Sequence, residues 1–198
     1  MTADEERKKS AMVGRARPLG AADYAILGLL REQPRYGYEL AESFREGGAL
    51  AGVCGMPLNV LYAQVHRLER FGLIGGTPEP AGGTRMRTVL RPTPAGSGAF
   101  LAWLDQPVGR MREVRQAFLL KLYFSRRDPS HDTLRLLDAQ IVRCEEYLAD
   151  RVRERRQTTP ESFEELLGQM RGSGARATLD WLKEYRAELA VRRAPVPS

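Results

Sequence analysis

The stretch MPLNVLYAQVHRLERFGLI, residues 56–74, decides the fold of this chain. Its apolar residues recur at steps of three and four, which is typical of an amphipathic helix. These residues are Leu58, Leu61, Val65 and Leu68. Pro57 suits the start of a helix, because the first turn does not use the N–H that proline lacks. Gly72 suits the position just after the last turn. The spacing predicts a helix over 58–71, and its opposite face carries Asn59, Tyr62, His66, Arg67 and Arg70.

A β-hairpin is predicted directly after this helix. Residues 73–74 form a short first strand, the glycines and prolines of 75–83 form a long tip, and 85–91 form the returning strand. Thr93 then suits the N-cap of a further helix over 94–104, because its hydroxyl can accept a hydrogen bond from the first turn.

Two more helices are predicted before residue 56, over 19–33 and 37–46, and a glycine-rich loop follows the second of them. The order helix, helix, helix, hairpin is that of a winged helix-turn-helix. We therefore predict a flexible tail over 1–18 and a winged-helix domain over 19–106.

The second half of the chain, 107–198, is predicted to be a helical domain, so that the whole protein is mainly α. A helix over 110–124 is followed by a long one over 131–157 that has no internal glycine or proline. Apolar residues follow the long helix as they follow the seam of a coiled coil. The seam consists of Leu134, Leu137, Ile141, Cys144 and Leu148. We expect it to mediate dimerisation; the alternative is that it packs only on the last helix of its own chain.

The end of the chain is predicted to form two shorter helices, over 160–170 and 175–191. The sequence Arg-Gly-Ser-Gly at 171–174 is expected to separate them, because two glycines so close together disfavour a helix. The second of these helices is amphipathic and is the expected packing partner of the seam.

Composition limits the classes of function. The 198 residues carry a net charge of +6, which is divided about evenly between the two halves and so marks no nucleic-acid-binding side. No apolar stretch approaches the roughly 18 residues of a membrane span, and the N-terminus lacks the apolar region of a secretory signal. Two distant cysteines suggest no metal site or disulfide framework, so a cytoplasmic protein is expected. Motifs for nucleotide binding, metalloproteases and hydrolases are missing from the sequence, and we expect no enzyme, no cofactor and no metal.

The first half resembles the PadR family of transcriptional regulators. Members of that family show Gly-Tyr-Glu-Leu at the start of the second helix, and then Leu-Tyr, Arg-Leu-Glu and Gly-Leu along the third. The corresponding residues here are 37–40, 61–62, 67–69 and 72–73. The wing and its exit match the family at Arg87, Arg91, Thr93 and Gly96.

The chain also departs from the family pattern. Leu90 and Pro92 stand where the family usually has Tyr and Leu, and Asn59-Val60 stands where Gly-Thr is common. The segment FLLKLYF, 118–124, resembles the C-terminal helical domain of the larger, virulence-activator-like members. The resemblance therefore covers 19 to about 190, and the departure at Asn59-Val60 predicts a DNA sequence unlike those of better-known relatives.

The resemblance implies a homodimeric regulator, most often a repressor, that binds a pseudo-palindromic DNA operator and is released by an aromatic or drug-like small molecule. Similar proteins hold such molecules in a cleft between the winged helices and the C-terminal helices. The aromatic residues expected to line that cleft are Phe100, Trp103, Phe118 and Tyr123. Two alternatives stay open: the aromatic residues are plain core, or the winged helix binds another protein and not DNA.

The residue types themselves indicate how DNA would be contacted. In the major groove Asn pairs with adenine and Arg with guanine, whereas Arg on a wing suits the narrow minor groove or the backbone. The expected contacts are Asn59, Tyr62, His66, Arg67 and Arg70 on the helix and Arg85 and Arg87 on the wing. Simpler roles also stay open, because Asn59 can cap the helix, Tyr62 can pack against the second helix and His66 can be a plain surface residue.

Overall fold

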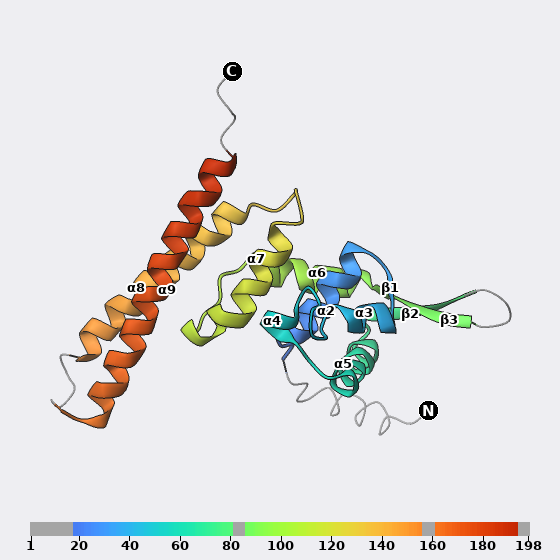
Figure 1. Cartoon of the computed structure of the whole chain (residues 1–198), viewed down its shortest axis with the longest axis horizontal. Coiled ribbons are helices and arrows are strands. Elements are labelled where there is room, and N and C mark those ends of the chain that lie inside the picture. The colour runs from blue at the N-terminus through green and yellow to red at the C-terminus, as the bar shows by residue number, and fades with distance from the viewer. Residues whose placement is uncertain (1–17, 81–85, 156–160, 194–198) are drawn as a thin grey trace, which may run out of the picture.

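The computed structural model describes residues 18–80, 86–155 and 161–193. The expected tail, except for Pro18, and the wing residue Arg85 lie outside the described residues. Figure 1 shows a winged-helix part at one end of the molecule, a long hairpin of two helices at the other, and α7 between them. The mainly helical fold that the sequence predicts is confirmed.

The winged-helix core is built by α2 (Ala21–Glu32), α3 (Gly37–Glu42) and α5 (Leu58–Arg70), with the short α4 (Ala51–Cys54) in the glycine-rich loop. Each helix turns an apolar stripe inward. Among the residues buried there are Ile26, Leu30, Leu40, Leu61, Val65 and Leu68. Three residues of the stripe predicted for 58–71 therefore hold α5 against α2 and α3. The prediction is wrong for Leu58, which is 56% exposed because it lies in the first turn, at the edge of the stripe.

The sheet has three antiparallel strands in the order β1 (Arg35–Tyr36), β3 (Met86–Pro92) and β2 (Ile74–Pro80). The prediction that 75–83 is a loop is wrong for 75–80, which pair with β3 along their whole length. Prolines are tolerated in β2 because it is an edge strand, where a missing N–H breaks no ladder on the outer side. The two residues of β1 were not predicted at all.

The helix α6 (Pro94–Leu104) has the predicted bounds and the predicted cap. The N–H of Gly96 donates to Thr93 Oγ1 at 3.1 Å. A Cβ at Gly96 would lie 1.9 Å from the carbonyl oxygen of Leu73, so only glycine allows α6 to pack this closely on the start of the wing.

The single helix predicted over 110–124 is wrong in detail. The chain forms a 3₁₀ turn, η1 (Met111–Glu113), then a π-helical turn, η2 (Val114–Phe118), and then α7 (Leu119–Ser125). This segment serves two cores, because Leu120 and Phe124 pack with the winged helix while Phe118 and Leu122 pack with the C-terminal helices. It lies beyond the expected boundary at 106 and joins the two parts.

The C-terminal part is an antiparallel hairpin of α8 (Thr133–Arg155) and α9 (Phe163–Arg193) (Figure 1). The predicted break at 171–174 is wrong, since α9 runs through it. Each glycine costs about 1 kcal/mol of helix propensity relative to alanine, and burial of Ala175, Leu179 and Leu182 in the C-terminal core offsets that cost. None of the helices in the described ranges is long and apolar enough to cross a membrane.

Candidate nucleic-acid interface and the adjoining cavity

The outward face of α5 holds most of the expected DNA contacts. Asn59, His66 and Arg70 are exposed. Asn59 does not cap the helix, because the N-cap is Pro57 and no side chain caps this end. His66 Nδ1 lies 3.1 Å from Glu69 Oε2, one turn along the same helix. These three side chains are free to meet a partner outside the protein.

Tyr62 has one side on the protein and one in solvent. A Cβ built on Gly37 would lie 3.1 Å from the ring and the hydroxyl of Tyr62, so the ring packs over the start of α3. The residue is still 38% exposed. Tyr62 therefore packs against the second helix while part of the residue stays in contact with solvent.

Arg67 does not lie on the exposed face where the sequence placed it. Its Nη2 lies 2.5 Å from Oδ2 of Asp23 on α2, and the side chain of Asp23 is only 3% exposed. The guanidinium also lies 5.7 Å from the ring centroid of Phe71. Arg67 thus turns toward its own protein, where its guanidinium pairs with a nearly buried carboxylate.

An exposed arginine of the wing, Arg87, lies close to the start of α3. Arg87 on β3 lies 6.0 Å from the ring centroid of Tyr36 and 5.7 Å from that of Tyr38. The two tyrosine rings are themselves stacked, with centroids 5.7 Å apart and planes 7° from parallel. Arg91 instead pairs with Glu79 across the hairpin, at 2.9 Å. The stack of Tyr36 and Tyr38 was not predicted, although the Tyr-x-Tyr spacing at the start of α3 is visible in the sequence.

A cavity of about 850 Å³ lies between the winged helix and the η1–η2–α7 segment. Its aromatic wall is formed by Tyr24 on α2 and Trp103 on α6, whose rings stack 4.6 Å apart. Polar side chains complete the lining, among them Gln106, Arg112, Glu113, Gln116 and Lys121.

The expectation that four aromatic residues line this cleft is wrong. Trp103 lines it, but Phe100 is buried in the winged-helix core and Phe118 in the C-terminal core. Tyr123 packs edge-on against Phe124, with centroids 5.0 Å apart. Residues 118 and 123 cannot share one wall, because five residues along a helix place them on different faces. Tyr24 was missed because it lies far from the others in the sequence.

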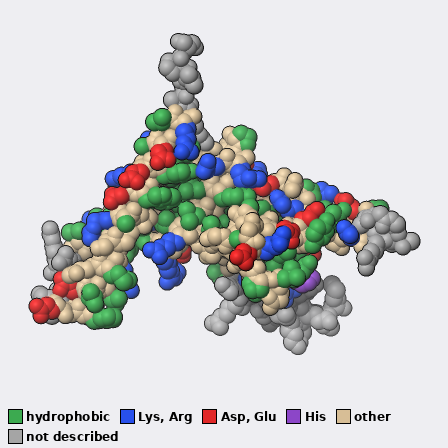
Figure 2. Space-filling view, in the orientation of Figure 1, with side chains coloured by type: hydrophobic (Ala, Val, Ile, Leu, Met, Phe, Trp, Pro, Cys, Tyr) green, Lys and Arg blue, Asp and Glu red, His purple; other side chains and the backbone are tan. Residues whose placement is uncertain are grey.

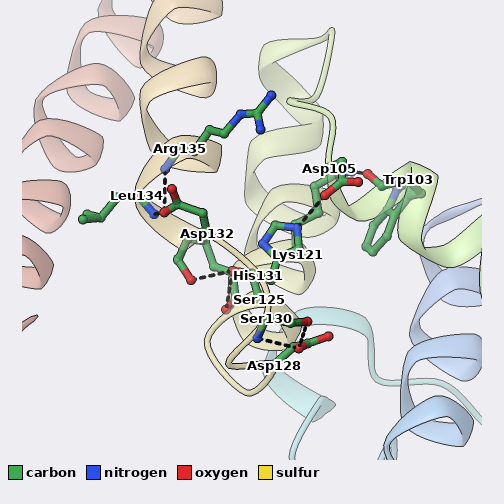
Figure 3. Close-up of polar contacts among 12 residues, drawn as sticks. Trp103, Asp105, Lys121, Ser125, Asp128, Ser130, His131, Asp132, Leu134 and Arg135 are labelled. Atoms are coloured by element: carbon green, nitrogen blue, oxygen red, sulfur yellow. Dashed lines mark hydrogen bonds and ion pairs between the residues drawn. The ribbon is translucent and has the colours of Figure 1, made fainter.

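Lys121 is the unusual group of this cavity (Figure 3). Its Nζ lies 4.0 Å from the ring centroid of Trp103 and donates to the backbone oxygen of that residue. Burial lowers the pKa of Lys121 to about 7, although the negative charge of Asp105 acts in the opposite direction. Asp105 in turn pairs with His131 at 2.9 Å, which ties the end of α6 to the loop before α8.

The comparison with protein families decides the identity of the winged-helix part. Residues 26–101 match the model of the transcriptional regulator PadR-like family. This segment of the chain therefore matches the PadR-like family. The family is one of transcriptional regulators, and the matched segment contains α3, α5, the wing and most of α6. No curated protein matches the chain significantly.

Solved PadR structures resemble this PadR-like chain at low identity. Bacillus subtilis PadR in complex with operator DNA is 22% identical with a TM-score of 0.44, over 86% of this chain and 99% of that one. The PadR-like regulator BC1756 from Bacillus cereus is 23% identical with a TM-score of 0.40, over 89% and 99%. The Bacillus subtilis protein has also been solved in complex with p-coumaric acid; that structure is 22% identical, with a TM-score of 0.40, over 86% of this chain and 99% of that one.

Proposed function

We propose that this PadR-like chain is a homodimeric repressor that binds a pseudo-palindromic operator through α5 and the wing. The observation that carries the proposal is the PadR-like segment itself, in which Asn59, His66 and Arg70 on α5 and Arg87 on the wing all stay exposed. A helix face of this kind fits the major groove, and an arginine on a wing fits the neighbouring backbone. That Bacillus subtilis PadR has been solved with operator DNA supports the same function here.

Arg67 takes a different part in this proposal from the one that the sequence suggested. Because its guanidinium is held by Asp23, we assign it to positioning α5 and not to contacting DNA. The expected DNA contacts are then Asn59, Tyr62, His66 and Arg70 on α5 and Arg87 on the wing; Arg85, outside the described residues, stays a candidate.

The dimer is proposed to form through the outer face of α9 and not through the predicted seam. Leu137 and Cys144 of the seam are fully buried in the core of their own chain, and Leu134, Ile141 and Leu148 pack against that core. On α9, by contrast, Phe163, Leu166 and Met170 are 67%, 60% and 65% exposed at helical spacing. Figure 2 shows hydrophobic side chains gathered at this far end of the hairpin. Two copies that bring these faces together would remove them from water.

Regulation is proposed to act through the cavity beside Trp103. The stacked rings of Tyr24 and Trp103 suit a flat aromatic molecule, and Lys121 suits a negative group on it. Bacillus subtilis PadR has been solved with p-coumaric acid, which has this chemistry. An effector releases the operator only if it binds one shape of the dimer more tightly than another.

The decisive experiment measures DNA affinity against salt concentration. Operator duplexes are selected from a random library, and their binding to the protein is followed by fluorescence anisotropy. A specific DNA-binding protein loses affinity steeply as salt rises, and Arg87→Ala is expected to lessen the slope by about one. Arg135→Ala on α8 is the matched control, because Arg135 is exposed and lies outside the PadR-like segment. A protein-binding module would select no sequence and show neither effect.

A further inference from the structure

The first two turns of α5 expose apolar side chains where a soluble protein would normally carry charge. Leu58 is 56% exposed and Val60 is 40% exposed. Asn59 and Ala63 are exposed as well, and the first turn has no acidic residue. Positive charge on the outward face begins only at Arg70. The exposed face of α5 is therefore divided into an uncharged half and a basic half.

Packing among the described residues does not account for Leu58 and Val60, which stay exposed. Neither residue belongs to the winged-helix core or to the apolar residues packed against it, whereas the nearby Met56 and Leu61 do. Exposed leucine and valine in isolation are common. Here they flank an exposed asparagine on a helix that is proposed to enter the major groove.

The chemistry of base edges indicates what this uncharged half would fit. In the major groove an A·T pair offers adenine N6 and N7, with which asparagine pairs bidentately, and the C5-methyl of thymine, which apolar side chains contact. A G·C pair offers no methyl group and favours arginine at guanine. The uncharged half of α5, with an asparagine among apolar side chains, thus matches A·T pairs. It has no arginine to pair with guanine in a G·C pair.

We propose that Leu58, Val60 and Ala63 contact thymine methyl groups and that Asn59 pairs with adenine, so that α5 selects A·T base pairs at the centre of each operator half-site. The basic half of the helix then meets phosphates, which hold the register but carry no sequence information. This inference rests on the proposed DNA binding and adds the class of base that is read.

The test removes single methyl groups from the DNA. Duplexes selected from a random library are synthesised with one thymine at a time replaced by deoxyuridine, which lacks only the C5-methyl. At one or more positions in each half-site, the replacement is expected to weaken binding by about fourfold, the value of one buried methylene-sized group. The double variant Leu58→Ala, Val60→Ala is expected to reduce the preference for thymine at the positions that those two side chains contact, whereas a position contacted by Ala63 keeps it.

Val142→Ala is the matched control, because Val142 is 51% exposed on α8 and lies outside the PadR-like segment. It must keep the full preference for thymine. Circular dichroism melting of each variant checks the fold, which exposed truncations are expected to leave unchanged. The inference is overturned if the selected half-sites are G·C at their centres, or if no uracil substitution weakens wild-type binding. Failure to select any sequence would instead reject the proposed DNA binding itself.

Discussion

Arg67 of α5 and Asp23 of α2 form an ion pair in which Nη2 and Oδ2 are 2.5 Å apart, and their side chains are 16% and 3% exposed. Asp23 Oδ2 also accepts the N–H of Gly20 at 2.7 Å, at the start of α2. One carboxylate therefore caps α2 and anchors α5. The orientation of α5, the helix that is proposed to face DNA, therefore depends on this pair as well as on the apolar stripe.

Removing the carboxylate is expected to be costly. Asp23→Asn leaves the partly buried guanidinium of Arg67 without its negative partner, and breaking such a buried pair costs about 3–5 kcal/mol. The matched control is Glu79→Gln, which breaks the pair with Arg91 on the wing, where both side chains are well exposed. That change is expected to cost less than about 1 kcal/mol. Urea unfolding of both variants measures the difference, and equal costs would contradict the structural role of Asp23.

A substitution at Arg87 can test whether the shape of its guanidinium matters for DNA binding in addition to its charge. Arg87→Lys keeps the positive charge but loses the planar guanidinium that lies over Tyr36 and Tyr38. The variant is expected to bind operator DNA several-fold more weakly, with an unchanged dependence on salt. Tyr38→Leu is expected to weaken binding in wild type but not in Arg87→Ala. Additive effects in that double-mutant cycle would show that the stack does not position Arg87.

Lys121 makes stability depend on pH in a defined direction. Its pKa is lowered from 10.5 to about 7, so between these values the unfolded chain holds a proton that the folded chain has lost. This group therefore makes the free energy of unfolding rise with pH across that window, and below pH 7 its destabilising effect is complete. Lys121→Met is expected to stabilise the protein most near pH 6 and least near pH 10.

Denaturant titrations of wild type and variant at several pH values measure this difference. Lys183→Met is the control, because Lys183 is exposed on α9 and pairs with Glu145. A difference for Lys121→Met that does not change with pH would mean that the amine keeps its ordinary pKa.

Two glycines of α6 offer a matched pair for packing. Gly96→Ala places a Cβ 1.9 Å from the Leu73 carbonyl, whereas Gly98→Ala meets nothing within 4 Å. The first change is expected to destabilise the fold by more than about 2 kcal/mol, because backbone must move. The second is expected to stabilise it by about 0.5–1 kcal/mol through helix propensity. Thermal melting distinguishes them, and a similar effect of both would contradict the close approach of α6 to Leu73.

Local pattern was enough to predict the winged helix. The stripe of α5, the cap at Thr93 and the return strand are each specified by neighbours within a few residues. The structure confirms the cap, the strand and the stripe apart from Leu58. The family resemblance could be drawn from the same short motifs. Features that are set by residues close together in the chain could therefore be predicted from the sequence.

What the sequence missed depends on distant contacts. No residue near Arg67 in the sequence indicates that it pairs with Asp23, 44 residues earlier. Likewise, no residue near Trp103 indicates that its ring stacks on Tyr24. The glycines at 172 and 174 disfavour a helix locally, but packing on α8 keeps α9 helical at these positions. The same packing buries the predicted dimer seam inside one chain, so the exposed residues of α9 became visible only in the structure.

The length of α9 has a mechanical consequence. Its 31 residues make a rigid rod of roughly 46 Å at 1.5 Å per residue. If two rods are clamped together, each winged helix sits at the end of a lever whose fulcrum is α7. A tilt of about 5° at α7 would shift the far end of each rod by about 4 Å relative to its winged helix, which is close to the roughly 3.4 Å rise of one base pair. A side-chain rearrangement around Lys121 would then be amplified into a mismatch with the spacing of the DNA half-sites.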